Sequence, residues 1–474
     1  KRPDLVDVDD LGPHGDIWNG KKFAATYADQ LLFVALLDQW FYWTGQRWKG
    51  VSSHFVVNQG KKEATKQLQL RGDVRRQEPN DFNEGMLKKA ATVHGSLERV
   101  KKMVEAAKSE EHLYLHSPEC FDQGNSLVCV ENGVIDLDSG KLLVAEPSQQ
   151  ITKIAGTTFN SEAEAPMFLQ FLQTVLPDPK VRAYLQRAVG YTLSGSIDEE
   201  VLFFLLGIGA NGKSVFANIL SELMNEYAVT VGNSLIAKGK HDSEAERQKV
   251  RLQGCRLGLI NETGIGDIWD DQRLKELASR EKMSVRPLYK EGHDFMPTHK
   301  LWIRGNHMPG AFDPGDGFWR RLHPIEFGVQ IPVEERIADL DRQIIQEELP
   351  GVLNWAMDGY RDYKTRGLRP PQAVTKFAEE YRQETDIVGL WFKERCIEDH
   401  SAQITTADAY VSYCDFCDGE GIKTMTKPTF SRTLASRGRK KSRDTSVRSF
   451  VGFGLKSHVC SDFDDNGEDA GALI

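Results

Sequence analysis

The feature that most constrains the fold is the segment Gly207-Ile-Gly-Ala-Asn-Gly-Lys-Ser214. It follows a short apolar run, Val201–Leu206, and precedes a helix-like segment, Val215–Tyr227. A buried strand, a glycine-rich turn and a helix in this order are typical of a phosphate-binding loop, in which backbone N–H groups surround phosphate oxygens. The sequence therefore predicts an α/β fold with a parallel strand, and a nucleotide site where that strand ends.

The residues of this loop have separable expected roles. Lys213 reaches the β- and γ-phosphates, Ser214 can bind Mg²⁺, and the helix N-terminus adds its positive dipole end. The bound species are accordingly expected to be ATP and magnesium. The expected nucleotide-binding residues are Gly207, Gly209, Asn211, Gly212, Lys213 and Ser214.

Hydrolysis also needs polar side chains that orient the attacking water. Leu257–Ile260 has the pattern of a second buried strand, and Glu262 follows its C-terminal end, where ligands collect in open α/β sheets. A third strand, Leu301–Arg304, is followed by Asn306, which could contact the γ-phosphate or the water. We therefore expect Glu262 and Asn306 to be catalytic.

Composition excludes several classes of protein. The 474 residues carry a net charge of −9, which argues against a uniformly basic DNA-coating protein. Seven scattered cysteines argue against a disulfide scaffold and favour a reducing cytosol. The longest apolar runs are far shorter than the roughly 20 residues that span a bilayer, so no membrane partner is expected. The chain begins with Lys1 and no signal peptide, and we interpret it as a segment of something longer.

Upstream of the loop the pattern is mixed. Aromatic residues in the first 60 positions suggest strands at Leu31–Leu37 and Trp40–Trp43, and residues 61–115 look helical. Alternating residues between 127 and 144, broken at Asn132-Gly133 and Ser139-Gly140, predict a small β-meander. Pro166–Gly190 is expected to be helical, and we place a domain boundary near residue 195.

The C-terminal segment differs in charge. Residues 421–456 hold ten basic residues and one acidic residue. Thr429–Arg437 is expected to be a helix that buries Phe430 and Leu434, followed by a basic turn and a strand pair around Val447–Val451. This order suggests a winged helix, with a solvated basic surface as the alternative. The expected DNA contacts are Arg432, Arg439, Lys440 and Lys441.

Cys414 and Cys417 could suggest zinc. No second pair with this spacing exists, and Tyr410 and Tyr413 complete a helical stripe with the two cysteines. A helix that buries two thiols is the preferred interpretation.

Several longer motifs resemble a known family. Asn132–Leu137, Gly190–Gly195, Pro297–Pro309 and Gly317–Leu322, together with the three strand ends, resemble the helicase portion of phage and plasmid primase–helicases, the poxvirus-type group of superfamily three. The resemblance runs from about residue 15 to residue 455. One departure is Asn261-Glu262, where many relatives carry two adjacent acidic residues.

The resemblance implies a ring, usually hexameric, that translocates on single-stranded DNA from 3′ to 5′. ATP sites lie between subunits, so a neighbour supplies an arginine finger, for which Arg321 is the best match and Arg320 its close rival. The hairpin-like segment 283–297 would contact DNA in the channel through Lys290, with Arg286 and His293 on its arms. From the residues alone, an ordinary surface hairpin is the alternative.

The expected organisation has four parts. An N-terminal α+β collar (1–194) precedes an AAA+-type motor (195–387), a winged helix (388–460) that binds duplex DNA, and an acidic disordered tail (461–474). The expected function is an ATP-dependent DNA helicase that replicates a mobile element in the cytoplasm of a bacterial host. Its other partners would be an upstream primase domain or a polymerase of the same element. The alternative is a non-motor initiator or a regulatory ATPase that assembles on DNA without unwinding it.

Overall fold

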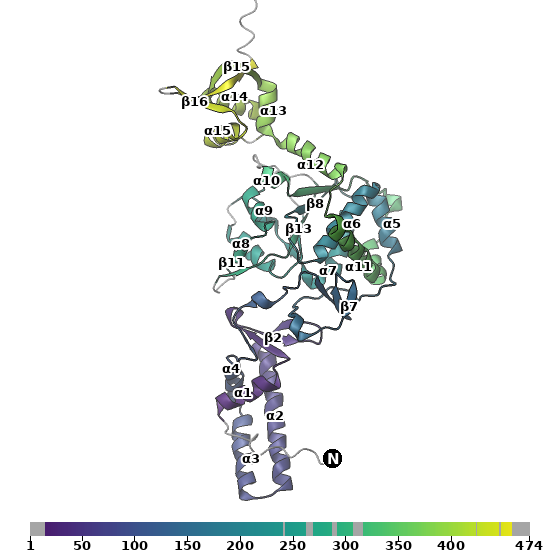
Figure 1. Ribbon diagram of the computed structural model, residues 1–474, viewed down its shortest axis with the longest axis vertical. Coiled ribbons are helices and arrows are strands. Elements are labelled where there is room, and N and C mark those ends of the chain that lie inside the picture. The colour runs from purple at the N-terminus through teal and green to yellow at the C-terminus, as the bar shows by residue number, and fades with distance from the viewer. Residues whose placement is uncertain are drawn as a thin grey trace, which may run out of the picture.

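The computed structural model describes residues 15–239, 242–261, 269–286, 292–306, 316–422, 424–444 and 447–456. The molecule is elongated, with a helical arm at one end, a central α/β body and a small C-terminal domain at the other end (Figure 1).

The arm is built on an antiparallel hairpin sheet with a parallel edge strand, in the order β3-β2-β1-β4. Ser52 and Asn80 cap α2 and α3 through their side chains, which explains where both helices begin. The strand expected at Trp40–Trp43 is confirmed, whereas the one expected over Leu31–Leu37 ends at Val34 and continues as a 3₁₀ helix, Ala35–Leu37. The expected helical region consists of three helices. The elements of the arm are α1 (Asp16–Thr26), β1 (Leu31–Val34), β2 (Gln39–Trp43), β3 (Trp48–Val51), α2 (Ser53–Gln77), α3 (Asp81–His94), α4 (Leu97–Ala107) and β4 (Tyr114–Leu115).

The expected meander is confirmed and joins the arm to the body. It comprises β5 (Leu127–Val130), β6 (Gly133–Asp136) and β7 (Lys141–Leu143). The Trp48 N–H donates to the Ile151 carbonyl at 2.8 Å, and Arg47 pairs with Glu226 of the body.

The body has a five-stranded parallel sheet in the order β14-β8-β13-β10-β9. Its elements are α5 (Pro166–Val175), α6 (Pro179–Leu193), β8 (Leu202–Leu206), α7 (Lys213–Met224), β9 (Ala228–Val231), α8 (Asp242–Arg251), β10 (Leu257–Asn261), α9 (Asp271–Leu277), β11 (Met283–Val285), β12 (His293–Phe295), β13 (Lys300–Gly305), α10 (Asp316–Trp319), β14 (Leu322–Glu326) and α11 (Leu340–Arg366). Alternate residues of β13 enter different cores: Trp302 packs toward α7, while Leu301 and Ile303 pack on the other face. The expected α/β sheet is therefore present, covered on both faces.

Two expectations need correction here. The helix expected over Pro166–Gly190 is two helices, because Pro177 and Pro179 lack the N–H groups that would continue it. The hydrophobic core also continues across residue 195, since α5 and α6 pack with α7 and α11. The expected boundary near residue 195 therefore does not divide the hydrophobic core into two.

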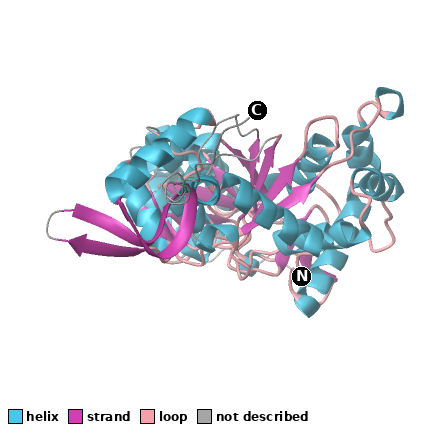
Figure 2. Ribbon diagram, turned by 90° about the horizontal axis from the view of Figure 1, so that it is seen from above, coloured by secondary structure: helices cyan, strands magenta, loops and turns pink. Residues whose placement is uncertain are grey.

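The C-terminal domain has its own core, which begins at Val388. After α12 (Gln372–Thr385) it comprises α13 (Ile387–Arg395), β15 (Cys396–Thr405), α14 (Thr406–Gly419), α15 (Lys427–Ser436), β16 (Lys440–Asp444) and β17 (Val447–Leu455). The sheet order is β15-β17-β16, and the β16–β17 hairpin projects from the domain (Figure 2). The expected basic helix is confirmed as α15, with Phe430 and Leu434 buried. The helix expected at Cys414 and Cys417 is confirmed as α14, in which Cys417 is buried beside Tyr413 while Cys414 is only half-buried.

No helix within the described ranges is both long enough and apolar enough to cross a bilayer.

One buried and one half-buried histidine, His299 and His323, are expected to make the body acid-sensitive. Burial lowers the pKa of His299 and of His323 to about 4. The unfolded value is about 6.5, so the unfolded chain binds more protons between pH 6.5 and pH 4, and each histidine should remove up to about 3 kcal/mol of stability as pH falls through that window. Urea unfolding at pH 7 and pH 4.5 measures this loss. His299→Leu should reduce it, and an unchanged pH dependence in that variant would contradict the assignment.

Candidate functional site

The glycine-rich loop connects the C-terminal end of β8 to the first residue of α7, Lys213. A Cβ atom at Gly207 would lie 2.4 Å from the Phe327 carbonyl oxygen. Gly212 has φ +83°, and a Cβ there would lie 2.7 Å from the Phe171 ring. Only glycine fits at these two positions, so the close approach of backbone that a phosphate cradle needs is built into the loop.

Lys213 is held in place by the loop itself. Its Nζ donates to the Gly207 carbonyl at 2.5 Å and to Asn211 Oδ1 at 3.0 Å. The amide of Asn211 in turn donates to the Phe327 carbonyl at 2.8 Å. Asn211 therefore positions the lysine from within the protein, and Ser214 next to it is exposed at the start of α7.

A second cation, Arg304, faces this lysine. Burial and the Arg304 charge together lower the pKa of Lys213 to about 8. Arg304 lies on β13, in register with Asn261 of β10 and Leu205 of β8. The sequence analysis did not assign Arg304 a role. Its position two residues after Trp302 could have indicated one, because alternate residues of a strand share a face and Trp302 packs on α7, the helix that follows the loop.

Asn261, at the C-terminal end of β10, has a buried side-chain oxygen that can accept a hydrogen bond. Its Oδ1 atom is buried and has no hydrogen-bond partner within the described part of the chain. A buried oxygen without a partner is costly, which fits a position that a ligand or water completes. Asn306 is exposed just beyond β13, and the expected catalytic Glu262 lies outside the described residues.

An apolar cavity of about 460 Å³ adjoins the loop. Ala210 and Gly212 of the loop line it, with Phe171 of α5, Ile331 from the segment before α11 and Leu340 at the start of α11. Flat aromatic groups suit cavities of this size and composition. The cavity can therefore accept a nucleobase whose phosphates reach the loop.

The two candidate arginine-finger residues, Arg320 and Arg321, lie at the other end of the parallel strands from the loop. Leu322 of β14 is in register with Leu202, the first residue of β8, whereas the loop follows the last residue of β8. Arg320 and Arg321 are thus separated from their own loop by the length of the strand, about 13 Å at roughly 3.3 Å per residue.

The two arginines differ in exposure. The Arg321 side chain is only 10% exposed and binds Glu200 at 2.9 Å and the Gly317 carbonyl at 2.8 Å. The Arg320 side chain is 67% exposed and lies 3.8 Å from Glu200. In this arrangement Arg321 has a structural ion pair, and Arg320 is the one available to a neighbour.

The expected hairpin strands are present as β11 paired with β12, and their contact with DNA stays a prediction. Arg286 is exposed after β11, and His293 on β12 hydrogen-bonds to Gln253 at 3.0 Å. Lys290, expected at the tip, lies outside the described residues.

Basic residues of the C-terminal domain are only partly available. Arg432 on α15 and Lys440 and Lys441 on β16 are exposed. Arg439, in contrast, pairs with Glu398 at 2.6 Å and stacks on the Phe392 ring. The structure thus places Arg439 in an internal contact and leaves the other three open to solvent.

Comparison with known proteins identifies two matching regions. Residues 20–177 match the family described as D5 N terminal like. Residues 205–321 match a family of unknown function, and this stretch holds the loop and the three strand ends.

Similar proteins come from DNA viruses. "Putative helicase L207/L206" of Acanthamoeba polyphaga mimivirus is 27% identical over 56% of this chain and 30% of that protein. "Putative helicase 121R" of Invertebrate iridescent virus 3 is 23% identical over 70% of this chain and 39% of that protein. "Putative primase C962R" of African swine fever virus is 24% identical over 43% of this chain and 22% of that protein. The chain thus spans less than two-fifths of each relative, and these viral proteins give no support to a bacterial host.

A solved structure shares the overall fold. The C-terminal region of NrS-1 in its apo form aligns with a TM-score of 0.50 over 92% of this chain and 99% of that chain, at 10% identity.

Proposed function

Since the chain belongs to the D5-like primase–helicase family of superfamily three, we propose that it is an ATP-driven DNA helicase motor. It would assemble as a ring and would translocate on single-stranded DNA from 3′ to 5′. The names of its relatives support a helicase-type role.

The observation that carries this proposal is the separation of the loop from the arginine pair. Lys213 follows the C-terminal end of β8, while Arg320 and Arg321 precede the N-terminal end of its neighbour β14. An exposed arginine at the far edge cannot complete its own site, but it can complete that of an adjacent subunit. The strand order, with the loop strand between β14 and β13, supports an AAA+-type motor.

The residues present fit ATP and magnesium. The loop can follow its course against Phe327 and Phe171 because Gly207 and Gly212 lack side chains, and Lys213 and Arg304 place two positive charges beside it. Ser214 and the unpartnered Oδ1 of Asn261 would hold magnesium, which neutralises phosphate charge when it is bound. Glu262 would orient water, and Asn306 would contact the γ-phosphate.

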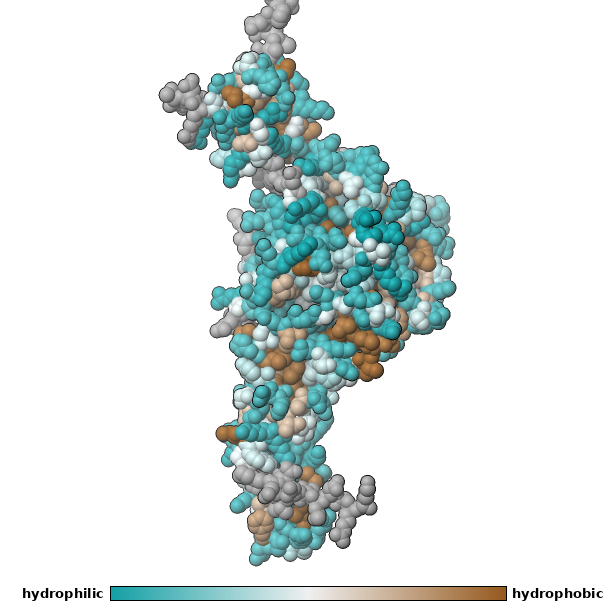
Figure 3. Space-filling view, in the orientation of Figure 1, coloured by the Kyte–Doolittle hydropathy of each residue, from teal (hydrophilic) through white to brown (hydrophobic). Residues whose placement is uncertain are grey.

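An exposed apolar surface supports assembly. Leu142, Leu143 and Val144 lie at β7, and Val144 is 80% exposed. Figure 3 shows apolar side chains gathered there, at the junction of arm and body. Exposed apolar patches of this kind often mark protein interfaces, so we assign this surface to subunit contacts in the ring.

The test is strand displacement by the full chain with ATP, compared with ATP hydrolysis with and without single-stranded DNA. Unwinding and DNA-stimulated hydrolysis are the expected results. Hydrolysis with stable DNA binding but no displacement of any duplex would favour the alternative, a regulatory ATPase or initiator.

The C-terminal domain should supply duplex affinity as a winged helix. Replacing Arg432, Lys440 and Lys441 with alanine should lower the log–log salt slope of duplex binding by about 2 to 3, because each lost phosphate contact removes about 0.9. A matched control replaces three exposed lysines of α2, Lys61, Lys62 and Lys66. Equal slopes in both triple variants would show that the basic segment is only a solvated surface.

A further inference from the structure

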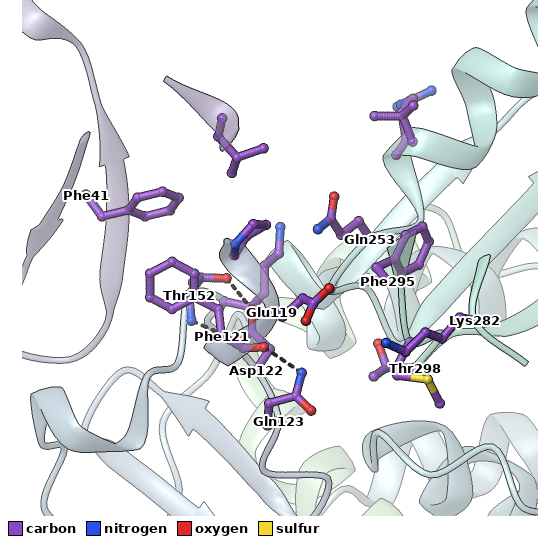
Figure 4. Close-up of a pocket in the computed structure, with 17 residues that line it drawn as sticks. Phe41, Glu119, Phe121, Asp122, Gln123, Thr152, Gln253, Lys282, Phe295 and Thr298 are labelled. Atoms are coloured by element: carbon purple, nitrogen blue, oxygen red, sulfur yellow. Dashed lines mark hydrogen bonds between the residues drawn. The ribbon is translucent and has the colours of Figure 1, made fainter. Parts of the chain in front are cut away.

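A second cavity, of about 530 Å³, lies where the arm meets the body. Phe41 of β2, together with Phe121 and Thr152, lines one side. Gln253, Lys282, Phe295 and Thr298 line the other side, and Glu119 lies between the two groups (Figure 4). This cavity is separate from the one beside the glycine-rich loop, since the two share no lining residue.

Aromatic rings form part of its wall. The Phe41 and Phe121 ring centroids are 4.8 Å apart, and Phe41 is half-buried while Phe121 is buried. Phe295, at the end of β12, faces them from the body. A half-buried ring supported by a second ring provides a surface on which a base can stack.

Cations line the same cavity. Lys153, Arg251 and Lys282 all contribute to it; Arg251 donates a hydrogen bond to Gln248 at 3.1 Å, and the Lys153 charge acts on Asp122. The acidic groups are Glu119 and Asp122. Asp122 accepts hydrogen bonds from the Thr152 N–H at 2.8 Å and from the Thr152 hydroxyl, and burial raises its pKa. The balance of charge is therefore positive, as an anionic ligand requires.

The cavity is connected to the expected DNA hairpin. Phe295 and Met296 lie at the base of β12, and Gln253 of the cavity hydrogen-bonds to His293 on the same strand. A single DNA strand bound by the hairpin could therefore also enter the cavity.

We propose that this cavity binds one nucleotide of a single DNA strand, with its base stacked on Phe41 and its flanking phosphates on Lys153, Arg251 and Lys282. The site rests on the proposed function, and it adds a contact where the arm meets the motor. The same chemistry, a base with a phosphate, would also fit a free mononucleotide.

The experiment measures binding of a labelled oligothymidylate to the full chain by fluorescence anisotropy at several salt concentrations. Replacing Lys153, Arg251 and Lys282 with alanine should lower the log–log slope by about 2, at roughly 0.7 per phosphate contact. Phe41→Leu should weaken binding about tenfold or more, whereas Phe41→Tyr should bind like the wild type. The matched controls are the Lys61, Lys62 and Lys66 triple variant and Phe82→Leu, which alters an exposed ring of α3.

Folding is checked by thermal unfolding. If the triple variant unfolds early, Arg251→Ala and Lys282→Ala, which change exposed side chains, should each lower the slope by about 0.7. Slopes and affinities equal to those of the controls would overturn the proposal. So would competition by thymidine monophosphate at the cavity without any effect of the variants on oligothymidylate binding.

Failure of the site and failure of the proposed function give different results. Wild-type chain that hydrolyses ATP faster with single-stranded DNA, while the cavity variants bind like wild type, overturns the cavity alone. Wild-type chain that neither binds single strands nor responds to them overturns both.

Discussion

Lys213→Ala should reduce ATP hydrolysis by a factor of about 10³ or more while the fold persists. The lysine is the cation held directly within the loop, by the Gly207 carbonyl and Asn211. Its removal leaves the backbone N–H groups of the cradle but takes away the charge that balances the β- and γ-phosphates. The measurement is steady-state phosphate release at saturating ATP.

The control for this variant is Lys180→Ala, which removes an exposed lysine at the start of α6. Thermal unfolding should be similar for both variants. Normal turnover by Lys213→Ala would refute the assignment of the nucleotide site.

Mixing Lys213→Ala chains with Arg320→Ala chains should restore part of the activity that each loses alone. In the mixture, a chain with an intact loop can stand beside a chain with an intact Arg320, and random assembly restores about one site in four. An arginine finger contributes a rate factor of about 10³ or more, so even this fraction is measurable. The measurement is ATP turnover of the mixture after verified co-assembly.

Arg321→Ala distinguishes the two arginines. Because Arg321 binds Glu200 and the Gly317 carbonyl within its own chain, its loss should lower the unfolding temperature, whereas Arg320→Ala should not. Rescue by Arg320→Ala chains identifies Arg320 as the finger. If only Arg321→Ala chains complement Lys213→Ala, the sequence expectation of Arg321 is correct; if no mixture recovers, the site is not shared between subunits.

Local patterns predicted much of this molecule. The strand, loop and helix around Lys213 could be read because apolar runs and glycines fix backbone conformation over a few residues. The meander between β5 and β7 and the basic helix α15 followed from the same short-range rules. These elements depend little on distant parts of the chain.

The exposure of individual arginines and the position of Arg304 depend on tertiary contacts, which local sequence patterns do not predict. Whether Arg320 or Arg321 is buried depends on Glu200, more than a hundred residues away, and no local pattern shows that pairing. The inward turn of Arg439 depends on Glu398 and Phe392 in the same way. Arg304 was missed because its spacing from Trp302 indicates only a shared face of the strand, whereas its proximity to Lys213 arises from the order of the strands.

The length of α2 gives the arm mechanical leverage. Its 25 residues extend about 37 Å at 1.5 Å per residue, and its base is attached to the body through Trp48 and the Arg47–Glu226 pair. A tilt of about 5° at that base would move the far end of the helix by about 3 Å. Small rotations of the body during a nucleotide cycle would thus become displacements at the tip as large as a side-chain contact, and a protein docked there would sense the cycle without touching the nucleotide.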